Sequence, residues 1–137
     1  MKNILFVCTG NCCRSQMAEG IGRALSRGRF EIKSAGTAPI GILPVTIRSM
    51  KEIGIDISEQ TSDFLSPSLL QWADYLVTLC NTVLDRLPLK PHGLKHIHWD
   101  IENPDRVYLS EEARLKGFAK TRDDIKKHIE ELFEELD

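Results

Sequence analysis

One short segment of the chain carries the residue types needed for nucleophilic chemistry on an oxyanion. In Cys8-Thr9-Gly10-Asn11-Cys12-Cys13-Arg14-Ser15, a thiol and a guanidinium lie six positions apart. A cysteine thiolate is a strong nucleophile, and a guanidinium can hold two oxygens of a tetrahedral anion while its charge favours that thiolate. Ser15 is placed to donate a hydrogen bond to the sulfur. We predict that Cys8 attacks the anion.

The rest of this segment is suited to holding the anion. Gly10 and Asn11 tolerate left-handed backbone conformations, which turn successive amide groups toward the inside of a loop. A helix that begins directly after such a loop adds partial positive charge. The predicted oxyanion-binding residues are Thr9, Gly10, Asn11, Cys12, Cys13 and Arg14. The competing interpretation is that Cys8 is a small buried apolar residue and Arg14 an ordinary surface residue.

Strands and helices alternate on either side of the loop. Residues 3–7 form an apolar run rich in strand formers, as expected of a strand buried on both faces of a parallel sheet. The predicted strands cover residues 3–7, 30–36, 75–79 and 94–99. The predicted helices begin after the loop, at Pro44, at Ser66-Pro67 and at Ser110. This alternation predicts an α/β fold in which ligands bind beyond the carboxyl ends of the strands, where Cys8 lies.

Composition limits the class of protein further. The chain has 137 residues, 42% of them hydrophobic, and 18 basic against 20 acidic side chains give a formal net charge of −2. This size favours a single domain over residues 1–137, and the charge balance provides no field that would hold nucleic acid. No apolar run is long enough to cross a bilayer and no signal segment opens the chain, so we expect a cytoplasmic monomer that does not bind membranes. The four cysteines are then expected to be free thiols.

The loop and its surroundings resemble a known family. Cys8, followed after five residues by Arg14-Ser15, resembles the low-molecular-weight protein tyrosine phosphatases, and the string from Phe6 to Gly20 is similar to the arsenate reductases built on that fold. Further similar segments are Ser34-Ala35-Gly36, residues 50–58, residues 60–63, Ala73-Asp74, residues 77–80 and His98-Trp99. The resemblance implies a flavodoxin-like, three-layer fold with a four-stranded parallel sheet flanked by helices. It also implies a thiolate that attacks arsenate or phosphate.

A second cysteine separates the two activities. The phosphatases hydrolyse a cysteinyl-phosphate with water, whereas the reductases use a second thiol to release arsenite, and Cys80 stands where the reductases have that thiol. The alternative for Cys80 is a core thiol at a strand end. Leu87 replaces the third cysteine of the thioredoxin-coupled reductases, so electrons cannot pass from Cys80 to a thiol at that position. We expect an external thiol, from thioredoxin, glutaredoxin or a small molecule, to attack instead, or the electrons to pass through Cys12 or Cys13. The resemblance thus implies an arsenate reductase, with a phosphatase as the alternative.

The general acid of the family is absent from its usual place. The family carries an aspartate before a proline in the loop after the fourth strand, and here Asn103 precedes Pro104. An amide cannot donate the proton, and Asp105, Glu102 or Asp100 would have to replace it. The phosphatases also carry tyrosines directly after this proline, and Asp105 and Arg106 stand there instead, so hydrolysis of aryl phosphates is expected to be poor. A third interpretation is a non-catalytic protein that only binds oxyanions.

No cofactor is required by this chemistry, but the resemblance implies one ion. In similar reductases a monovalent cation, potassium, is held by polar positions that match Asn11, Glu19, Ser34, Thr61 and Asp63 here. The alternative is a buried hydrogen-bond network that shapes the loop. His96 and His98 lie on one face of a predicted strand, but without further ligands at recognisable spacing we expect them to pack rather than bind zinc.

Overall fold

The computed structural model describes all residues, 1–137, and contains a four-stranded sheet. Its strands are β1 (Lys2–Cys8), β2 (Phe30–Gly36), β3 (Tyr75–Thr78) and β4 (Lys95–His98). They are ordered β2-β1-β3-β4, and every neighbouring pair is parallel. The predicted α/β fold with a four-stranded parallel sheet is confirmed, and the four strands lie where the apolar runs predicted them.

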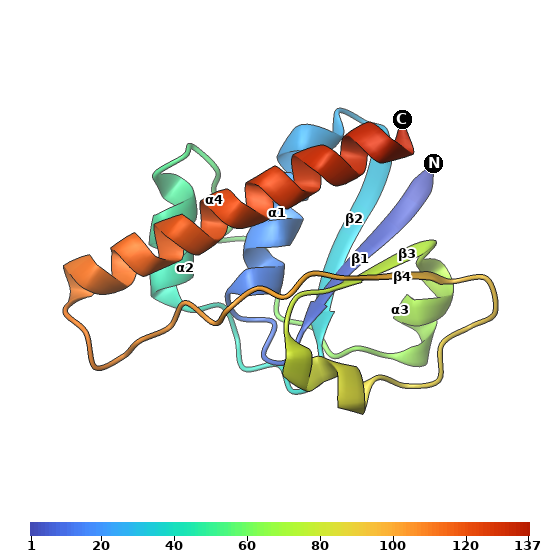
Figure 1. The fold of residues 1–137 in the computed structure, drawn as a ribbon, viewed down its shortest axis with the longest axis horizontal. Coiled ribbons are helices and arrows are strands. Elements are labelled where there is room, and N and C mark those ends of the chain that lie inside the picture. The colour runs from blue at the N-terminus through green and yellow to red at the C-terminus, as the bar shows by residue number, and fades with distance from the viewer.

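Three helices lie on the connections between strands and a fourth follows the last strand (Figure 1). They are α1 (Arg14–Ser26), α2 (Pro44–Lys51), α3 (Pro67–Trp72) and α4 (Glu111–Leu136). In Figure 1, α4 runs across α1 and α2, and it packs against both, whereas α3 lies apart from them and contacts β1. None of the helices is both long and apolar enough to span a membrane.

Local sequence signals explain where the helices begin. The hydroxyl of Ser66 accepts a hydrogen bond from the Leu69 amide, and that of Ser110 accepts one from the Ala113 amide, as N-cap residues do. The loop-to-helix junction at Cys13 has no side-chain cap, so the first amides of α1 remain available to another acceptor. One element was not predicted: a 3₁₀ helix, η1, follows β3 over Asn81–Arg86.

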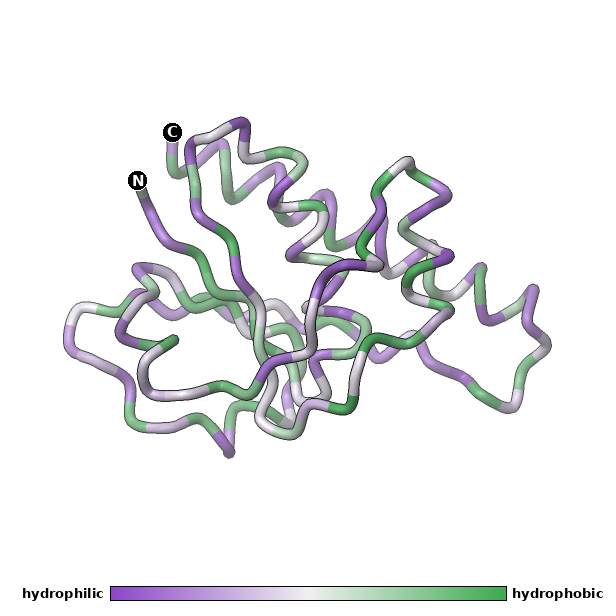
Figure 2. The backbone as a smooth tube through the Cα atoms, turned by 180° about the vertical axis from the view of Figure 1, so that it is seen from behind, coloured by the Kyte–Doolittle hydropathy of each residue, from purple (hydrophilic) through white to green (hydrophobic).

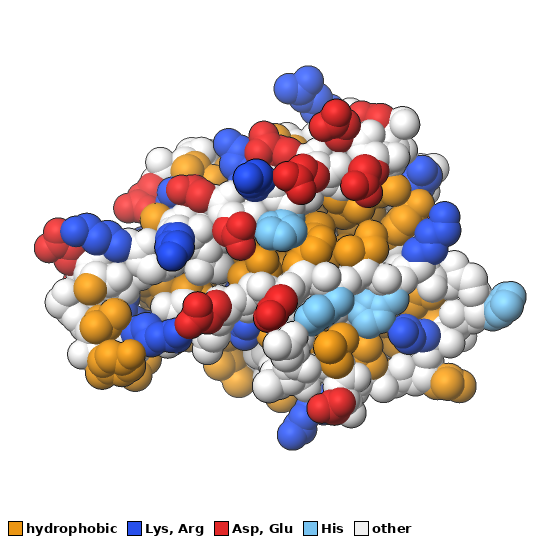
Figure 3. All heavy atoms as spheres, in the orientation of Figure 1, with side chains coloured by type: hydrophobic (Ala, Val, Ile, Leu, Met, Phe, Trp, Pro, Cys, Tyr) orange, Lys and Arg blue, Asp and Glu red, His pale blue; other side chains and the backbone are white.

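The centre of the sheet forms the core. The middle of β1, residues 4–7, is fully buried, because neighbouring strands and helices cover both of its faces. Figure 2 shows β1 as mainly hydrophobic after its first residues. On the outside, side chains of both charge signs are interspersed over α4, as the near-neutral sequence implies (Figure 3).

Sheet register brings the two predicted redox thiols to the same edge. Cys8 is the last residue of β1, and Val7 pairs with Thr78 at the end of the neighbouring β3. The Leu79 amide extends this pairing by donating to the Val7 carbonyl at 2.9 Å. Cys80 is the next residue, so it lies beyond the carboxyl end of β3, beside the loop that follows β1.

Gly36, at the end of β2, allows the 8–15 loop to approach the sheet. A β-carbon at this position would lie 2.5 Å from the carbonyl oxygen of Thr9 and 2.9 Å from the amide nitrogen of Asn11. Both are backbone atoms, so neither can move aside without displacing the loop. Only glycine fits here, because its missing side chain leaves space that the loop backbone occupies.

We expect Gly36→Ala to lower the free energy of unfolding by about 1–3 kcal/mol, the usual cost of overpacking, and to weaken phosphate binding because the loop is displaced. Gly117→Ala is the matched control, since its β-carbon would lie at an ordinary 3.5 Å from the nearest atom and within a helix. Alanine there should stabilise the protein by up to about 1 kcal/mol. Urea unfolding of both variants measures the difference, and equal stabilities would contradict the steric argument.

Candidate active site

The 8–15 loop turns its amide groups inward because its carbonyl groups are bound from outside. The Thr9 carbonyl accepts a hydrogen bond from the Ala38 amide at 2.9 Å. The Gly10 carbonyl accepts one from the Ile40 amide at 3.0 Å. All peptide bonds are trans, so each N–H points away from the carbonyl of the same peptide unit. The amides that follow these two carbonyls therefore face the inside of the loop.

The tip of the loop is held in the same way. The Cys12 carbonyl accepts from the Leu43 amide at 3.2 Å. The Asn11 carbonyl accepts from the side-chain amide of Gln16 at 3.1 Å and from the hydroxyl of Ser62 at 3.0 Å. The result is a ring of inward amides at the start of α1, and such a ring binds an anion.

Asn11 fixes the shape of this ring. It is fully buried and has a left-handed backbone conformation with φ of 45°, as its residue type predicted. Its side-chain NH₂ group donates to the hydroxyls of Ser15 at 2.7 Å and Ser34 at 3.1 Å, and its side-chain oxygen accepts from the Asp63 amide at 2.7 Å. Asn11 therefore connects the loop to two other segments of the chain.

Cys8 lies at the base of the ring. Its sulfur is 2.9 Å from the Ser15 hydroxyl, the contact expected from the sequence. Burial raises the pKa of the Cys8 thiol above its usual value, while the Ser15 hydrogen bond and the Arg14 charge act in the opposite direction. In the free site Cys8 is therefore mainly a thiol. Each hydrogen-bond donor that faces the sulfur stabilises its thiolate form.

Arg14 has a buried nitrogen that is free to bind an anion. Its NH1 group donates to the Ile101 carbonyl at 2.8 Å, which anchors the side chain to the loop after β4. Its Nε is buried and has no hydrogen-bond partner. A buried donor without a partner is costly, and an oxyanion in the ring is an acceptor that would satisfy it.

Cys80 is linked to the loop by a hydroxyl. The Thr9 hydroxyl lies 3.3 Å from the Cys80 sulfur, and the Thr82 hydroxyl lies 3.6 Å from it. Burial works to raise the pKa of Cys80, but these two hydroxyls and the Arg14 charge outweigh it and bring the pKa below its usual value. Cys80 is thus more readily ionised than Cys8, as a thiol that attacks another sulfur requires.

A cleft of about 650 Å³ opens over these groups. Its lining includes Arg14 and Cys80 together with residues of the loops after β3 and β4. The carboxylates of Asp100 and Glu102 both reach it, and so does Asn103. The cleft gives a small oxyanion a route from solvent to the ring.

The three carboxylates considered as acids differ in their partners. Asp105 does not line the cleft, and one of its oxygens accepts from two nitrogens of Arg114, at 2.8 and 3.1 Å. Glu102 lines the cleft but is paired with Arg106 at 2.6 Å. The Asp100 side chain lines the cleft and has no hydrogen bond or ion pair. The geometry therefore favours Asp100 over Asp105 and Glu102.

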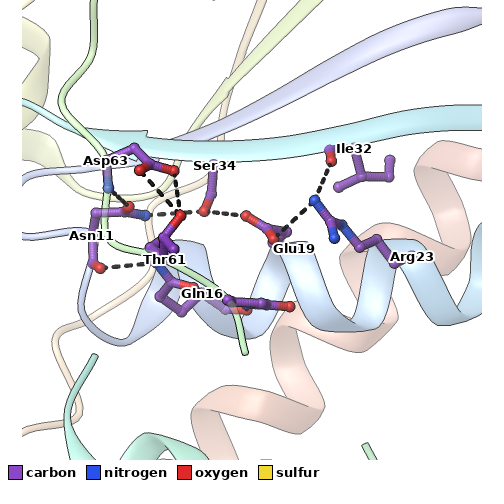
Figure 4. Close-up of polar contacts among 9 residues, drawn as sticks. Asn11, Gln16, Glu19, Arg23, Ile32, Ser34, Thr61 and Asp63 are labelled. Carbon is purple, nitrogen blue, oxygen red and sulfur yellow. Dashed lines mark hydrogen bonds and ion pairs between the residues drawn. The ribbon is translucent and has the colours of Figure 1, made fainter. Parts of the chain in front are cut away.

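The five residues expected to hold a monovalent cation do lie together (Figure 4). The Ser34 hydroxyl donates to Glu19 at 2.6 Å, and the Thr61 hydroxyl donates to Asp63 at 2.9 Å. Burial raises the pKa of Glu19, against the Ser34 hydrogen bond and the charge of Arg23, which pairs with Glu19 at 3.1 Å, and the charge of Asp63 adds to the effect of burial. Asn11 joins this group through both ends of its amide, since its NH₂ donates to Ser34 and its oxygen accepts from the Asp63 amide, but it does not line the cavity that the other four residues share.

The two histidines are occupied by hydrogen bonds. Nε2 of His96 and Nδ1 of His98 both contact the Thr78 hydroxyl, at 2.9 and 2.7 Å. The structure contains no group of three or more His, Cys, Asp or Glu side chains that could hold a metal ion. Sequence reasoning missed the contributions of Gln16, Ser62 and Thr82, since a polar side chain that binds a distant loop has no local sequence signal.

Comparison with known proteins gives consistent results. The chain matches the low molecular weight phosphotyrosine protein phosphatase family over residues 3–137. It is 43% identical to an arsenate reductase of Shouchella clausii (97% of this chain, 96% of the relative) and 41% identical to an arsenate reductase of Bacillus subtilis, with the same coverage.

Solved structures show the same two branches. An arsenate reductase in the phosphate-binding state is similar over 100% of both chains, with 32% identity and a TM-score of 0.81. A low molecular weight protein tyrosine phosphatase from T. tengcongensis is similar over 98% of this chain and 99% of the other, with 28% identity and a TM-score of 0.81.

We expect Ser15→Ala to raise the pKa of Cys8 further, because the variant loses a hydrogen bond to the thiolate. Such a bond contributes about 1.5–3 kcal/mol, so at a given pH below the pKa the thiolate fraction should fall about tenfold or more. A pH titration of thiolate ultraviolet absorbance, corrected with Cys8→Ser, measures this fraction. Ser26→Ala, a buried serine at the far end of α1, is the control. An unchanged titration in Ser15→Ala would refute the role of this hydroxyl.

Proposed function

The chain belongs to the low molecular weight phosphotyrosine protein phosphatase family, and from this premise we propose that it reduces arsenate to arsenite through Cys8 and Cys80. The observation that carries the proposal is the second thiol. Cys80 lies beside the loop, contacts Thr9 and has a lowered pKa. Hydrolysis by a cysteine phosphatase has no use for such a group, whereas reduction of arsenic requires it. The similarity to arsenate reductases over nearly the full chain supports the same function.

In the first step Cys8 attacks arsenic while the inward amides and Arg14 hold the remaining oxygens. An arsenic–oxygen bond breaks and an arsenic–sulfur bond forms. The proton of the Cys8 thiol goes to the departing oxygen, which leaves as water. The raised pKa of Cys8 suits this transfer, because the thiol brings the proton that the leaving group needs. Arsenic is still in the +5 state after this step.

In the second step the Cys80 thiolate attacks the Cys8 sulfur. A sulfur–sulfur bond forms, the arsenic–sulfur bond breaks, and its electron pair stays on arsenic. Arsenic is reduced to the +3 state and leaves as arsenite, while the two thiols are oxidised to a disulfide. The pairing of β1 with β3 supports this step, because it brings the residues after both strands to one edge of the sheet.

An external thiol must then reduce the disulfide. Leu87 is half-buried and packs against the core, and the protein has no cysteine other than residues 8, 12, 13 and 80. The third thiol of the thioredoxin-coupled reductases has therefore no equivalent after η1. We propose that thioredoxin, glutaredoxin or a small thiol attacks the Cys8–Cys80 disulfide directly.

Phosphoester hydrolysis is the alternative, and Asn103 argues against it. Hydrolysis of a cysteinyl-phosphate needs a group that first acts as an acid and then activates water as a base. Asn103 can do neither, and its side-chain oxygen accepts a hydrogen bond from the Asp105 amide at 3.1 Å. Hydrolysis would therefore depend on Asp100, which lines the cleft but does not stand at the family's acid position. The reductive route avoids this requirement, because Cys80 takes the place of the water.

We further propose that potassium binds beside the loop. Glu19, Ser34, Thr61 and Asp63 present oxygen atoms around a cavity of about 330 Å³, and oxygen is the ligand that hard cations prefer. Arg23 pairs with Glu19 at 3.1 Å and offsets part of its charge, while the charge of Asp63 still raises the pKa of Glu19. A cation between the two carboxylates would relieve that repulsion. Because Ser34 also contacts Asn11, the ion would stabilise the shape of the loop.

We expect fully reduced protein, mixed with excess arsenate and no other reductant, to form one arsenite per chain and to lose two thiols. Cys80→Ser should form none, because the Cys8 adduct has no thiol to release it. Cys12→Ser is the control, because it tests whether the loss of a thiol other than Cys80 also prevents arsenite formation. Arsenite from Cys80→Ser in wild-type yield, or none from the wild type, would refute the proposed mechanism.

We expect potassium chloride to raise the unfolding temperature relative to choline chloride at equal ionic strength. At tenfold excess over the dissociation constant the gain is about 1.4 kcal/mol, or a few degrees. Glu19→Gln should lose most of this difference, whereas Glu59→Gln, an exposed carboxylate lining the same cavity, should keep it. Equal unfolding temperatures in the two salts would leave the cluster as a hydrogen-bond network only.

A further inference from the structure

The tip of the 8–15 loop carries two thiols that the proposed reaction does not use. The sulfurs of Cys12 and Cys13 lie 3.9 Å apart. Cys13 is buried, with 3% of its surface exposed, whereas Cys12 is only partly buried. The pair therefore combines a fixed thiol with one that reagents in solution can reach.

The two thiols differ in acidity as well. The hydrogen bond between Cys12 and Cys13 lowers the pKa of Cys12, and the Arg14 charge acts in the same direction, against the effect of burial. The same bond raises the pKa of Cys13, which keeps its proton. The more exposed thiol, Cys12, is thus the more acidic of the two, and Cys13 is a neighbour that can react after it.

This pair is poorly suited to forming a disulfide. Neighbouring α-carbons across a trans peptide are about 3.8 Å apart, below the 4.4–6.8 Å range that disulfides usually span. The peptide between Cys12 and Cys13 is trans. Cys12 and Cys13 therefore stay as two thiols. An atom that bridges the two sulfurs avoids the geometric constraint, because a sulfur–atom–sulfur link is longer than a direct sulfur–sulfur bond.

The number of ligands selects the kind of atom that fits. Zinc requires three or four side-chain ligands, and no cluster of three or more His, Cys, Asp or Glu side chains is present. Trivalent arsenic forms stable compounds with two thiolates when it keeps one other substituent. A soft thiolate pair of this kind suits a soft, thiophilic centre.

We propose that Cys12 and Cys13 form a dithiol site for trivalent arsenic that carries at least two exchangeable hydroxyl groups. Arsenite, the product of the proposed reaction, belongs to this class, and to that extent the inference rests on the proposed function. Two arsenic–oxygen bonds break and two arsenic–sulfur bonds form, and the two thiol protons leave in two water molecules. Arsenic stays in the +3 state, so no oxidant or reductant takes part.

Occupation of this site would act on the oxyanion ring. The bridged segment contains the peptide between Cys12 and Cys13, whose amide is one of the inward groups. The Cys12 sulfur also lies 3.0 Å from the place where a β-carbon on Gly10 would stand, so it packs directly beside the loop backbone. Bound arsenic would therefore hold the loop in one conformation, and accumulated product would inhibit the next turnover.

The test uses Cys8→Ser/Cys80→Ser, which retains only the Cys12–Cys13 pair, with phenylarsine oxide as the probe. We expect a one-to-one adduct by mass spectrometry and the loss of two thiols. An added dithiol should remove the arsenic from the protein. An added monothiol should need a concentration on the order of a hundredfold higher than it needs for a single-thiol site, because two linked arsenic–sulfur bonds must break. Adding Cys12→Ser or Cys13→Ser to this variant provides the single-thiol controls.

Alkylation mapping of the wild-type protein provides a second measurement that does not depend on the folding of the variants. Phenylarsine oxide, and separately arsenite, should protect Cys12 and Cys13. Protection of Cys8 and Cys80 instead, or an adduct that a monothiol removes as easily as from the single-thiol controls, would overturn the inference. Neither experiment uses arsenate, so a failure of the proposed reductase activity would appear separately, as absence of arsenite in the single-turnover assay.

Discussion

The site depends on one constraint: the carbonyl groups of the 8–15 loop must be satisfied outside the loop so that its amides can face inward. A buried amide or carbonyl without a partner costs about 1–3 kcal/mol, so the loop could not hold this conformation alone. The segments after β2 provide the partners, through the backbone amides of residues 38, 40 and 43 and through Ser62. The inward amides gain hydrogen-bond acceptors when an anion binds, and these hydrogen bonds favour anion binding.

The same loop gives four thiols four different environments. Cys8 is buried, so its proton is retained until a substrate arrives, whereas Cys80 lies beside two hydroxyls that favour its thiolate. The contact between Cys12 and Cys13 lowers the pKa of Cys12 and raises that of Cys13. These differences follow from burial and hydrogen bonding, since all four residues are chemically identical. They separate a thiol that delivers a proton from one that attacks as a thiolate.

The sequence predicted the fold well because the fold depends on local periodicity. The apolar run of β1, the Ser-Pro start of α3 and the Ser110 cap of α4 are all local signals, and all three were confirmed. Within the site, the Cys8–Ser15 contact and the left-handed Asn11 follow from residue types in one loop. The partners of the carboxylates could not be predicted. Asp105 is paired with Arg114 and Asp100 is not paired, because the path of the chain between β4 and α4, and no local pattern, decides which charges meet.

Asn103 and Cys80 are best understood together. A phosphatase that lost its acid would keep the oxyanion ring but lose turnover, because water would attack the cysteinyl intermediate without assistance. A second thiol removes that dependence, since a thiolate needs no base once its pKa is lowered, and Thr9 and Thr82 lower it here. The residue before Pro104 then has no acid–base role. The Asn103 side chain instead stabilises the turn by accepting a hydrogen bond from the Asp105 amide. Replacing the acid by an amide is therefore tolerable in a reductase, whereas the same change in a hydrolase would remove the step that completes the cycle.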